Sequence, residues 1–177
     1  MTLSSRTLFA EIVREEPIDV GRACLLIGAE THPDLDVDAS LGELNRLAAV
    51  AHPLVAQHGA AEGLRLALGG FSGGDEDFGD VRSSLLHEVL RRRRGLPILL
   101  SVVWCEVAAR IDELAVPLGL PGHVLVCVGD PLDAHQVVDP FRGGQPVAVP
   151  PEPVLQPVDL LLHELAILRR DTQVLQG

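Results

Sequence analysis

Aromatic residues are scarce in this 177-residue chain, which contains four phenylalanines, one tryptophan and no tyrosine. Its apolar fraction of 47% therefore comes from leucine, valine and alanine, and it is that of a globular protein able to bury a substantial core. Cysteine is scarce too, and three cysteines at irregular spacing argue against a disulfide framework. We find no internal repeat and expect one domain over residues 1–177.

Positive charge is in short supply as well. Fourteen basic residues stand against 25 acidic ones, which gives a formal net charge of −11. An acidic surface opposes non-specific binding to nucleic acid and to anionic membranes, so we expect neither as a partner. The four consecutive arginines at 91–94 are a local exception. They either grip a phosphate or an acidic partner, or they form a solvated helix end.

Long apolar runs and metal-ligand patterns are also missing. The strongest apolar run, residues 96–109, contains Glu106 and is too short to span a bilayer. Residues 1–17 lack the apolar core of a secretory signal, so we expect a cytoplasmic protein. The seven histidines show no metal-ligand spacing, and the acidic loop at 75–80 lacks the spacing of a calcium loop. We predict a solvated acidic loop, no metal and no cofactor.

Apolar residues at helical spacing predict helices through the first ninety residues. Asp19 is suited to cap the second of them. Ser40, with Glu43 three residues later, has the spacing of a capping box for the third. Pro53 should kink or divide that third helix, and the paired glycines at 69–70 should end the fourth.

Two more helices are predicted in the centre of the chain. Ser83 or Ser84 should start the first, whose arginines at 91–94 then lie at the C-terminal end favoured by the helix dipole. Gly95 should stop it. Pro97 suits the first turn of the second helix, where its missing N–H group is not needed.

After this central helix the apolar pattern changes to that of β-strands. Residues 123–128 and 135–139 predict an antiparallel hairpin, with a preceding strand at 114–118. Residues 146–158 are proline-rich and predicted to be extended, and Asp159 should cap a last helix. Helices, then a hairpin sheet, then a helix predict an α+β fold.

One histidine and one aspartate stand out in the hairpin. With the turn centred near residue 131, His123 should lie across from about Asp139. Opposed residues of an antiparallel pair have Cβ atoms about 5 Å apart, close enough for a carboxylate to orient an imidazole and fix its tautomer. The pair is either part of a catalytic triad or a tie between two strands.

Four segments occur in an order that resembles a known family: residues 25–48, 69–111, 120–126 and 137–144. The strings R-R-x-G-x-P-I, L-P-G-H and D-P-F-x-G-G are unusual and stand at fitting separations. Together the segments resemble the bacterial transglutaminase-like family that includes an invasion-regulator protein. The resemblance covers roughly residues 20–147. Family members commonly continue with a helical repeat region, whereas about 30 residues follow here.

The resemblance implies a fold similar to that of papain-type cysteine proteases, with a buried central helix packed on a small antiparallel sheet. Active relatives in the superfamily use a cysteine at the start of the central helix, with a histidine and an aspartate on adjacent strands. His123 resembles that histidine and Asp139 that aspartate. The chain departs from the family pattern at Gly74, Ser83 and Leu99, and at an aromatic pair reduced to Phe78 and Gly79.

The nucleophile is the main departure. By the position of the helix start, the cysteine position falls at or near Pro97, which offers neither a nucleophile nor an acidic proton. Ser101, one turn further on, is the best substitute, but it needs an adjacent base and an oxyanion site. Cys105 lies eight residues after Pro97, about 12 Å further along the helix. Cys127 lies about 13 Å along the strand from the histidine, and Cys24 belongs to the helical first half of the chain.

Glu106 also requires a partner, because an unpaired charge in an apolar helix is costly. Arg110, four residues later, is the simplest partner. Support of the His123 region is the functional alternative.

Three functions follow as hypotheses. The first is a pseudoenzyme that binds a peptide or protein partner in a cleft at His123. The second is an acyl-transfer hydrolase or transglutaminase-like enzyme acting on peptide amides through Ser101, His123 and Asp139. The third is a structural or regulatory domain with no ligand at the histidine.

Overall fold

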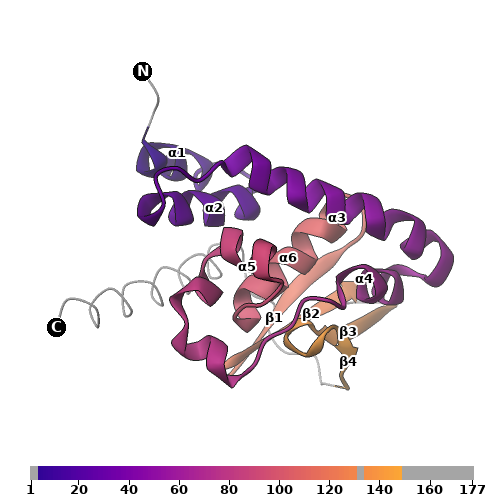
Figure 1. Ribbon diagram of the computed structural model, residues 1–177. Coiled ribbons are helices and arrows are strands. Elements are labelled where there is room, and N and C mark those ends of the chain that lie inside the picture. Colours follow the sequence, from indigo (N-terminus) through magenta and orange to yellow (C-terminus); the bar gives the residue numbers. More distant parts are fainter. Residues whose placement is uncertain (1–3, 131–133, 149–177) are drawn as a thin grey trace.

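The computed structural model describes residues 4–130 and 134–148 as a helical half packed on a small antiparallel sheet (Figure 1). The helices are α1 (Ser5–Ile12), α2 (Val20–Thr31), α3 (Val37–His58), α4 (Ala60–Leu68), α5 (Leu86–Arg92) and α6 (Pro97–Ala109). The strands are β1 (Ala115–Leu120), β2 (His123–Gly129), β3 (His135–Asp139) and β4 (Gln145–Pro146). Short 3-10 turns are η1 (Asp75–Gly79), η2 (Val81–Ser84) and η3 (Pro140–Arg142). The predicted α+β class is confirmed.

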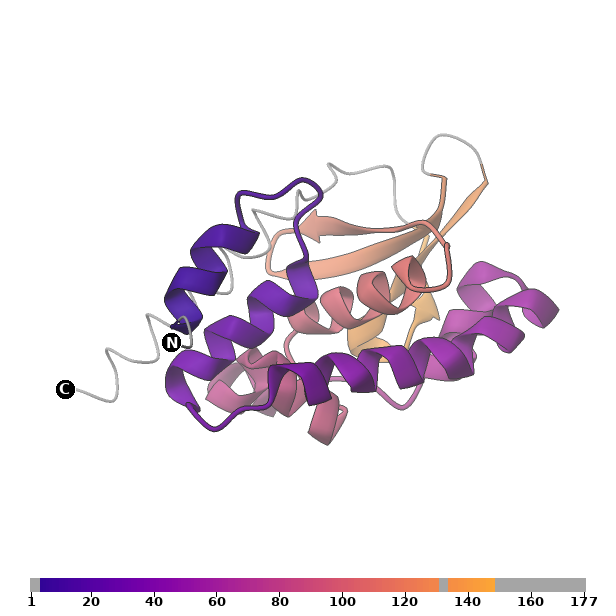
Figure 2. The same ribbon diagram turned by 90° about the horizontal axis from the view of Figure 1, so that it is seen from above.

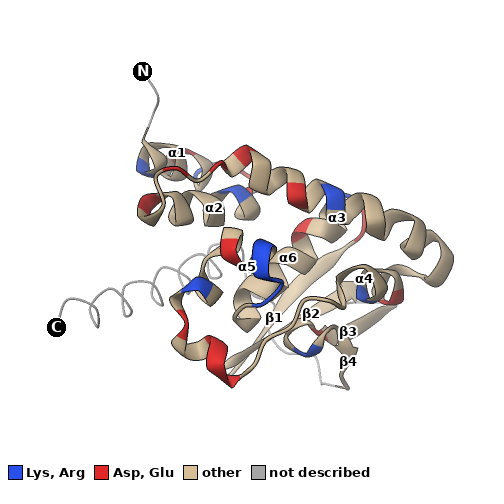
Figure 3. Cartoon of the chain, viewed as in Figure 1, with Lys and Arg blue, Asp and Glu red and all other residues tan. Residues whose placement is uncertain are grey.

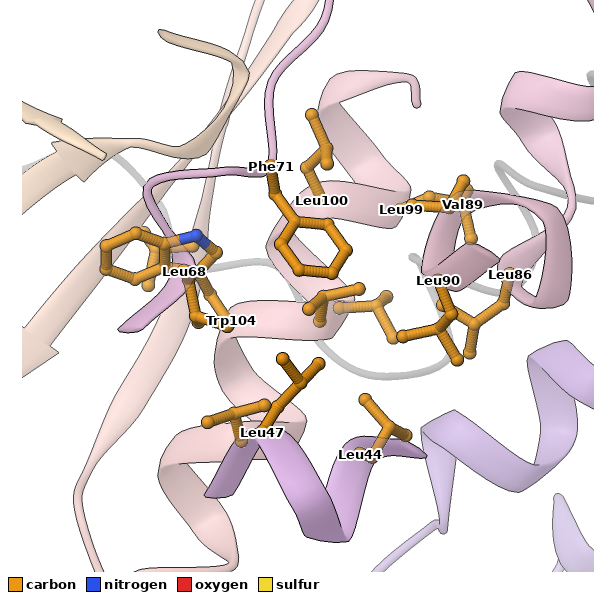
Figure 4. Close-up of a cluster of buried hydrophobic side chains, with 14 of the residues drawn as sticks. Leu44, Leu47, Leu68, Phe71, Leu86, Val89, Leu90, Leu99, Leu100 and Trp104 are labelled. Atoms are coloured by element: carbon orange, nitrogen blue, oxygen red, sulfur yellow. The ribbon is translucent and has the colours of Figure 1, made fainter. Parts of the chain in front are cut away.

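Helix α6 lies in the middle of the molecule. Seen from above, the sheet covers one side of α6 and α3 covers the other (Figure 2). Ten of its thirteen residues are buried, as expected for a helix that is apolar on every face. Pro97 occupies its first turn, as predicted. Figure 4 shows Leu99, Leu100 and Trp104 of this helix among leucines of α3 and α5 and the ring of Phe71.

Helix caps confirm one prediction and correct another. Asp19 caps α2 by accepting a hydrogen bond from the N–H of Arg22 at 2.9 Å. The cap of α3 is Asp36, whose side chain accepts from the N–H of Ala39 at 2.8 Å. Ser40 lies inside α3, where its hydroxyl donates to the carbonyl of Asp36. The prediction of Ser40 as the cap was wrong because a carboxylate stood one turn earlier.

Helix α3 continues without a break through Pro53, so the proline does not divide it. Proline removes one hydrogen bond to the carbonyl four residues earlier. Pro53 and that residue, Ala49, both lie on the exposed side of the helix, where water can satisfy the freed carbonyl. Helix α4 ends at the paired glycines, as predicted.

Helix α5 begins later and ends earlier than the sequence predicted. Ser83 and Ser84 lie in η2, and α5 starts only at Leu86. Arg93 takes the left-handed conformation (φ 57°) and ends the helix two residues before Gly95. The two serines are therefore buried in a turn rather than placed at a helix start.

The four strands form one antiparallel sheet in the order β1-β2-β3-β4. Val124, Val126 and Val128 of β2 pack with the core around α6, whereas Leu125 and Cys127 pack in a second cluster. The outer strands each contain a proline, Pro117 in β1 and Pro146 in β4. The hairpin and the preceding strand are confirmed.

The register of the hairpin differs from the prediction by two residues. Val126 pairs with Val138 and Gly129 with His135, which leaves five residues between the last pair. Extending the ladder by three steps sets His123 opposite Phe141 rather than Asp139. The extended segment and helix predicted after residue 148 lie outside the described residues. In the described part of the chain, no helix is long and apolar enough to cross a membrane.

Candidate functional site

His123 and Asp139 are hydrogen-bonded despite the shifted register. Nε2 of His123, at the start of β2, lies 3.0 Å from Oδ1 of Asp139, at the end of β3. They meet as diagonal neighbours across the strand pair, a separation that long side chains can bridge. The His123 side chain keeps 26% of its surface exposed, whereas Asp139 keeps 7%. The imidazole is therefore held by a buried carboxylate and still reaches the surface.

Asp139 is fixed by more than the histidine. Its Oδ1 also accepts a hydrogen bond from the backbone N–H of Phe141 at 3.0 Å, which caps η3. The guanidinium Nε of Arg142 lies 3.7 Å from the other carboxylate oxygen, Oδ2. Because the turn holds the carboxylate, the carboxylate can hold the ring in one orientation.

Three rings form a row beside this pair. The centroids of His123 and Phe141 are 5.7 Å apart with the rings nearly perpendicular, and Phe78 lies 5.7 Å beyond Phe141. We call Phe78, Phe141 and His123 the aromatic row. Phe78 is 59% exposed, unusual for so large an apolar side chain. The Phe141 ring also presses on the backbone of Gly73, where a Cβ atom would overlap it.

The loop that carries Phe78 is anchored by Asp77, which is buried. Its carboxylate accepts hydrogen bonds from the hydroxyl of Ser83 at 2.6 Å, from the N–H of Gly74 at 2.8 Å and from Nη2 of Arg94 at 2.7 Å. Burial acts to raise the pKa of Asp77, but Arg94, Ser83 and the Gly74 N–H group outweigh it and hold that pKa below its usual value.

A second set of ion pairs continues the anchor. Asp80 binds Arg82 at 2.9 Å and Arg92 at 3.0 Å, and Glu76 binds Arg94. Acidic and basic segments accordingly lie together at this end of the molecule (Figure 3). We call Asp77, Asp80, Arg92 and Arg94 the arginine clamp.

The arginine clamp corrects two predictions. The acidic loop is not simply solvated, and the arginine run at 91–94 is not simply a solvated helix end, because each supplies the other's counter-charges. Arg91 agrees better with the prediction of a solvated helix end, since it pairs with Glu88 on the exposed side of α5. The sequence alone did not predict this pairing, because the turn η2 and most of α5 separate the two runs in the chain.

The predicted position of the nucleophile is closed. Pro97 is buried in the first turn of α6. Ser101 is 0% exposed, and its hydroxyl donates a 2.7 Å hydrogen bond to the carbonyl of Ile98. A hydroxyl bound in this way inside a helix satisfies its own hydrogen-bonding needs and presents no lone pair to solvent.

The cysteines are poor nucleophiles in this fold. Desolvation, with a smaller effect of Glu106, raises the pKa of the Cys105 thiol to about 12. Burial and then Asp130 raise the pKa of Cys127, which packs in the second apolar cluster of the sheet. Cys24 is buried in α2. At neutral pH the thiols of Cys105 and Cys127 are therefore protonated.

Glu106 has partners other than the histidine. Its carboxylate binds Nη1 of Arg110 at 2.5 Å, which confirms the predicted pair, and accepts a hydrogen bond from the N–H of Gly21 at 2.9 Å. Glu106 therefore ties α6 to the start of α2. Within residues 4–130 and 134–148, no three His, Cys, Asp or Glu side chains are grouped so that they could hold a metal ion.

Comparison with known families finds one family model that covers most of the described chain. The model of the transglutaminase-like superfamily matches residues 35–150. The chain belongs to this superfamily. The superfamily match begins just before α3 and includes α6, the sheet, the aromatic row and the arginine clamp.

Relatives of this superfamily member are known from bacteria. A UPF0162 protein of Pseudomonas aeruginosa is 31% identical over 147 residues, which cover 80% of this chain and 53% of the relative. UPF0162 proteins of two Xylella fastidiosa strains are 42% identical over 79 residues, which cover 44% of this chain and 27% of each relative. The matches thus span from about a quarter to about half of the length of these curated relatives. No solved structure matches the chain.

Proposed function

We propose that this transglutaminase-like domain is a pseudoenzyme that binds a peptide or protein segment at His123. The observation that carries the proposal is the contrast between the imidazole of His123 and the hydroxyl of Ser101. His123 is oriented by Asp139 and reaches the surface, whereas Ser101 is buried and bonded to Ile98. This contrast supports a site that keeps the orienting half of a triad, while Ser101, the predicted nucleophile, is buried and already hydrogen-bonded.

Binding at this site would use the imidazole nitrogen of His123 that is not bonded to Asp139. Because the Asp139 carboxylate only accepts hydrogen bonds, a neutral imidazole donates from Nε2 and leaves Nδ1 as an acceptor. A backbone N–H group of a partner can donate to Nδ1 while an apolar side chain of the partner packs on Phe78, the exposed end of the aromatic row. A neutral or weakly basic segment suits a chain whose net charge is −11.

Acyl transfer is the alternative, and the His123–Asp139 hydrogen bond favours it, because catalysis of this type needs an oriented base. The reaction would require Ser101 to leave the Ile98 carbonyl and reach the surface. We also propose that the domain belongs with the bacterial branch that includes the invasion-regulator protein, and that it acts in the cytoplasm. The strings at 92–98, 120–123 and 139–144 support that assignment.

Two experiments on the intact chain separate binding from catalysis. The first exposes the protein to a fluorophosphonate probe that phosphonylates active serines, and we expect no labelling. Labelling that disappears in Ser101→Ala would replace our proposal by the enzyme.

The second experiment selects phage-displayed random peptides on the protein and measures the binding of the enriched peptides. We expect binding to be lost in His123→Ala and in Phe78→Ala. His135→Ala is the matched control, because His135 lies on β3 of the same sheet and is exposed. Circular dichroism establishes that each variant is folded. Enriched peptides that bind His123→Ala as well as the unaltered protein would refute binding at this site.

A further inference from the structure

His87, on α5, is an imidazole without a hydrogen-bond partner. Both of its ring nitrogens are buried, and neither has a partner among the described residues. A neutral imidazole always carries one N–H donor, and a protonated one carries two. The neutral ring thus leaves one donor unsatisfied, and protonation would bury a charge and a second donor.

The surroundings of His87 are built from the end of α2. The ring of His32, which follows α2, meets the His87 ring at a centroid distance of 4.8 Å and an interplanar angle of 66°. Gly28 of α2 provides the space, because a Cβ atom there would lie 2.7 Å from Nδ1 of His87. The backbone of α2 therefore lies against Nδ1 of the imidazole, although the His87 residue as a whole is only half-buried.

The charged groups near His87 oppose its protonation on balance. Desolvation and then His32 lower the pKa of His87; Glu88 raises it and Arg91 lowers it. Glu88 is itself bound to Arg91 at 2.7 Å, so its carboxylate is not free to pair with the imidazole. Within the described residues, η2, α3 and α6, the other elements packed on α5, contribute no further group to this shift.

The sign of the pH effect follows. We call the form with α5 packed on the end of α2 closed, and the form with α5 moved away from it open. Because the pKa of His87 in the closed form lies below the ordinary 6.5, the open form binds a proton more readily. The contact between α2 and α5 therefore has its full strength above pH 6.5 and weakens as the pH falls below that value. An open form with an ordinary imidazole gains up to about tenfold in population between pH 7.5 and pH 5.5.

Helix α5 also connects this contact to the arginine clamp. Its last residue, Arg92, binds Asp80, and Arg94, two residues later, binds Asp77. Both carboxylates belong to the loop that carries Phe78. Any loosening of α5 thus reaches the exposed end of the aromatic row through two ion pairs.

We propose that His87 is a proton-sensitive latch: its protonation releases α5 from the end of α2 and loosens the arginine clamp and the Phe78 loop. The latch is a conformational device of the fold and does not depend on peptide binding.

Hydrogen exchange of the full chain at pH 7.5 and pH 5.5, corrected for the intrinsic pH dependence of exchange, tests the latch. We expect exchange at pH 5.5 to be up to about tenfold faster in residues 28–35, 86–92 and 75–80, with the centre of α6 unchanged. An NMR titration of the ring protons should find His87 neutral at a pH where an exposed histidine is half protonated. Equal titration of His87 and an exposed histidine would overturn the proposal.

Three variants complete the test. In His87→Phe, which keeps a ring but cannot be protonated, the ratio of exchange rates should fall toward one. In His32→Gln, which removes a ring that opposes protonation, His87 should titrate at a higher pH. His52→Gln, at an exposed position of α3, should behave as the unaltered chain.

Two results would contradict the latch. If His87→Phe keeps the same pH dependence, another group causes it. If exchange accelerates in residues 28–35 and 86–92 while residues 75–80 stay unchanged, the link to the arginine clamp is wrong.

Discussion

Buried thiols behave as apolar side chains in this fold, and that behaviour has a chemical consequence. Desolvation raises the pKa of Cys105 to about 12, and burial raises the pKa of Cys127 as well. We predict that, at pH 8, a disulfide reagent such as 5,5′-dithiobis(2-nitrobenzoate) modifies the folded protein slowly and the protein unfolded in urea at once. A thiol that reacts within seconds in the folded protein would identify a reactive cysteine and contradict the prediction.

The His123–Asp139 contact illustrates what single residues reveal. The proximity of the two side chains followed from two strands and a short turn, and the structure has them in hydrogen-bonding distance although the register is shifted by two residues. The prediction survived the shift because both side chains lie at strand ends and can meet diagonally. The aromatic row did not follow from the sequence, because Phe78 and Phe141 are far apart in the chain and come together only through the packing of η1 on η3.

The arginine clamp anchors the turns η1 and η2 to the end of α5 and the residues after it. Asp77→Ala should lower the free energy of unfolding by about 2 kcal/mol or more, because it leaves the buried Ser83 hydroxyl and Gly74 N–H group without their acceptor. Urea unfolding monitored by circular dichroism measures the loss. Asp75→Ala is the control: Asp75 is exposed in the same turn, and its removal should change the stability by less than about 0.5 kcal/mol.

The stabilisation that Asp77 provides should depend on pH. The folded-state pKa of Asp77 lies below the ordinary 3.8, so its carboxylate stabilises the protein above that pH and ceases to do so as the pH falls below it. The stability difference between the unaltered chain and Asp77→Ala should therefore shrink in acid. A difference that is constant from pH 7 to pH 3 would mean that the charge of Asp77 is not what stabilises the turn.

The start of α3 gives a direct test of a helix cap. Asp36→Ala should cost about 1 kcal/mol of unfolding free energy, because the N–H group of Ala39 loses its acceptor. Ser40→Ala should be close to neutral, since its hydroxyl bonds only to a carbonyl that the helix already uses. Thermal unfolding of both variants makes the comparison, and a larger loss for Ser40→Ala would restore the capping box.

Helix boundaries show where sequence reasoning is limited. Asp19 was identified as a cap because it is the polar residue next to an apolar stripe, and no competitor stands nearby. At α3 a serine and a glutamate had the right spacing, but the helix begins one turn earlier, where Asp36 accepts from the N–H of Ala39. Before α5, the hydroxyl of Ser83 bonds to Asp77 and that of Ser84 to the carbonyl of Val81, contacts that no local pattern reveals.

The single tryptophan reports on the whole core. Trp104 is fully buried in α6, between the sheet and the helical half, with Gly144 packed against its ring. We predict that its fluorescence emission lies at short wavelength in the folded protein, and that it shifts in the same urea transition as the helical circular dichroism signal. Two separate transitions would show that the helical half and the sheet unfold independently, against the single domain that we predict.

At the level of the complete fold, the order of helices and strands along the chain was the best predictor of the architecture. Apolar periodicity located the helices and the hairpin, and the resemblance of the 69–111 and 137–144 segments fixed how they pack. The position of α6 between sheet and helices also follows from composition, because a helix that is apolar on all faces has to be covered on all faces. The register, the ion pairs and the aromatic row depend on distances that only packing defines.

The prolines of the outer strands have a consequence for the behaviour of this protein in concentrated solution. A free sheet edge normally offers a row of amide donors on which another chain can align. Pro117 and Pro146 each remove one such donor, one on either side of the described sheet. A second molecule would meet a gap in the donor row at both borders, which disfavours fibril growth even for a chain so rich in valine and leucine.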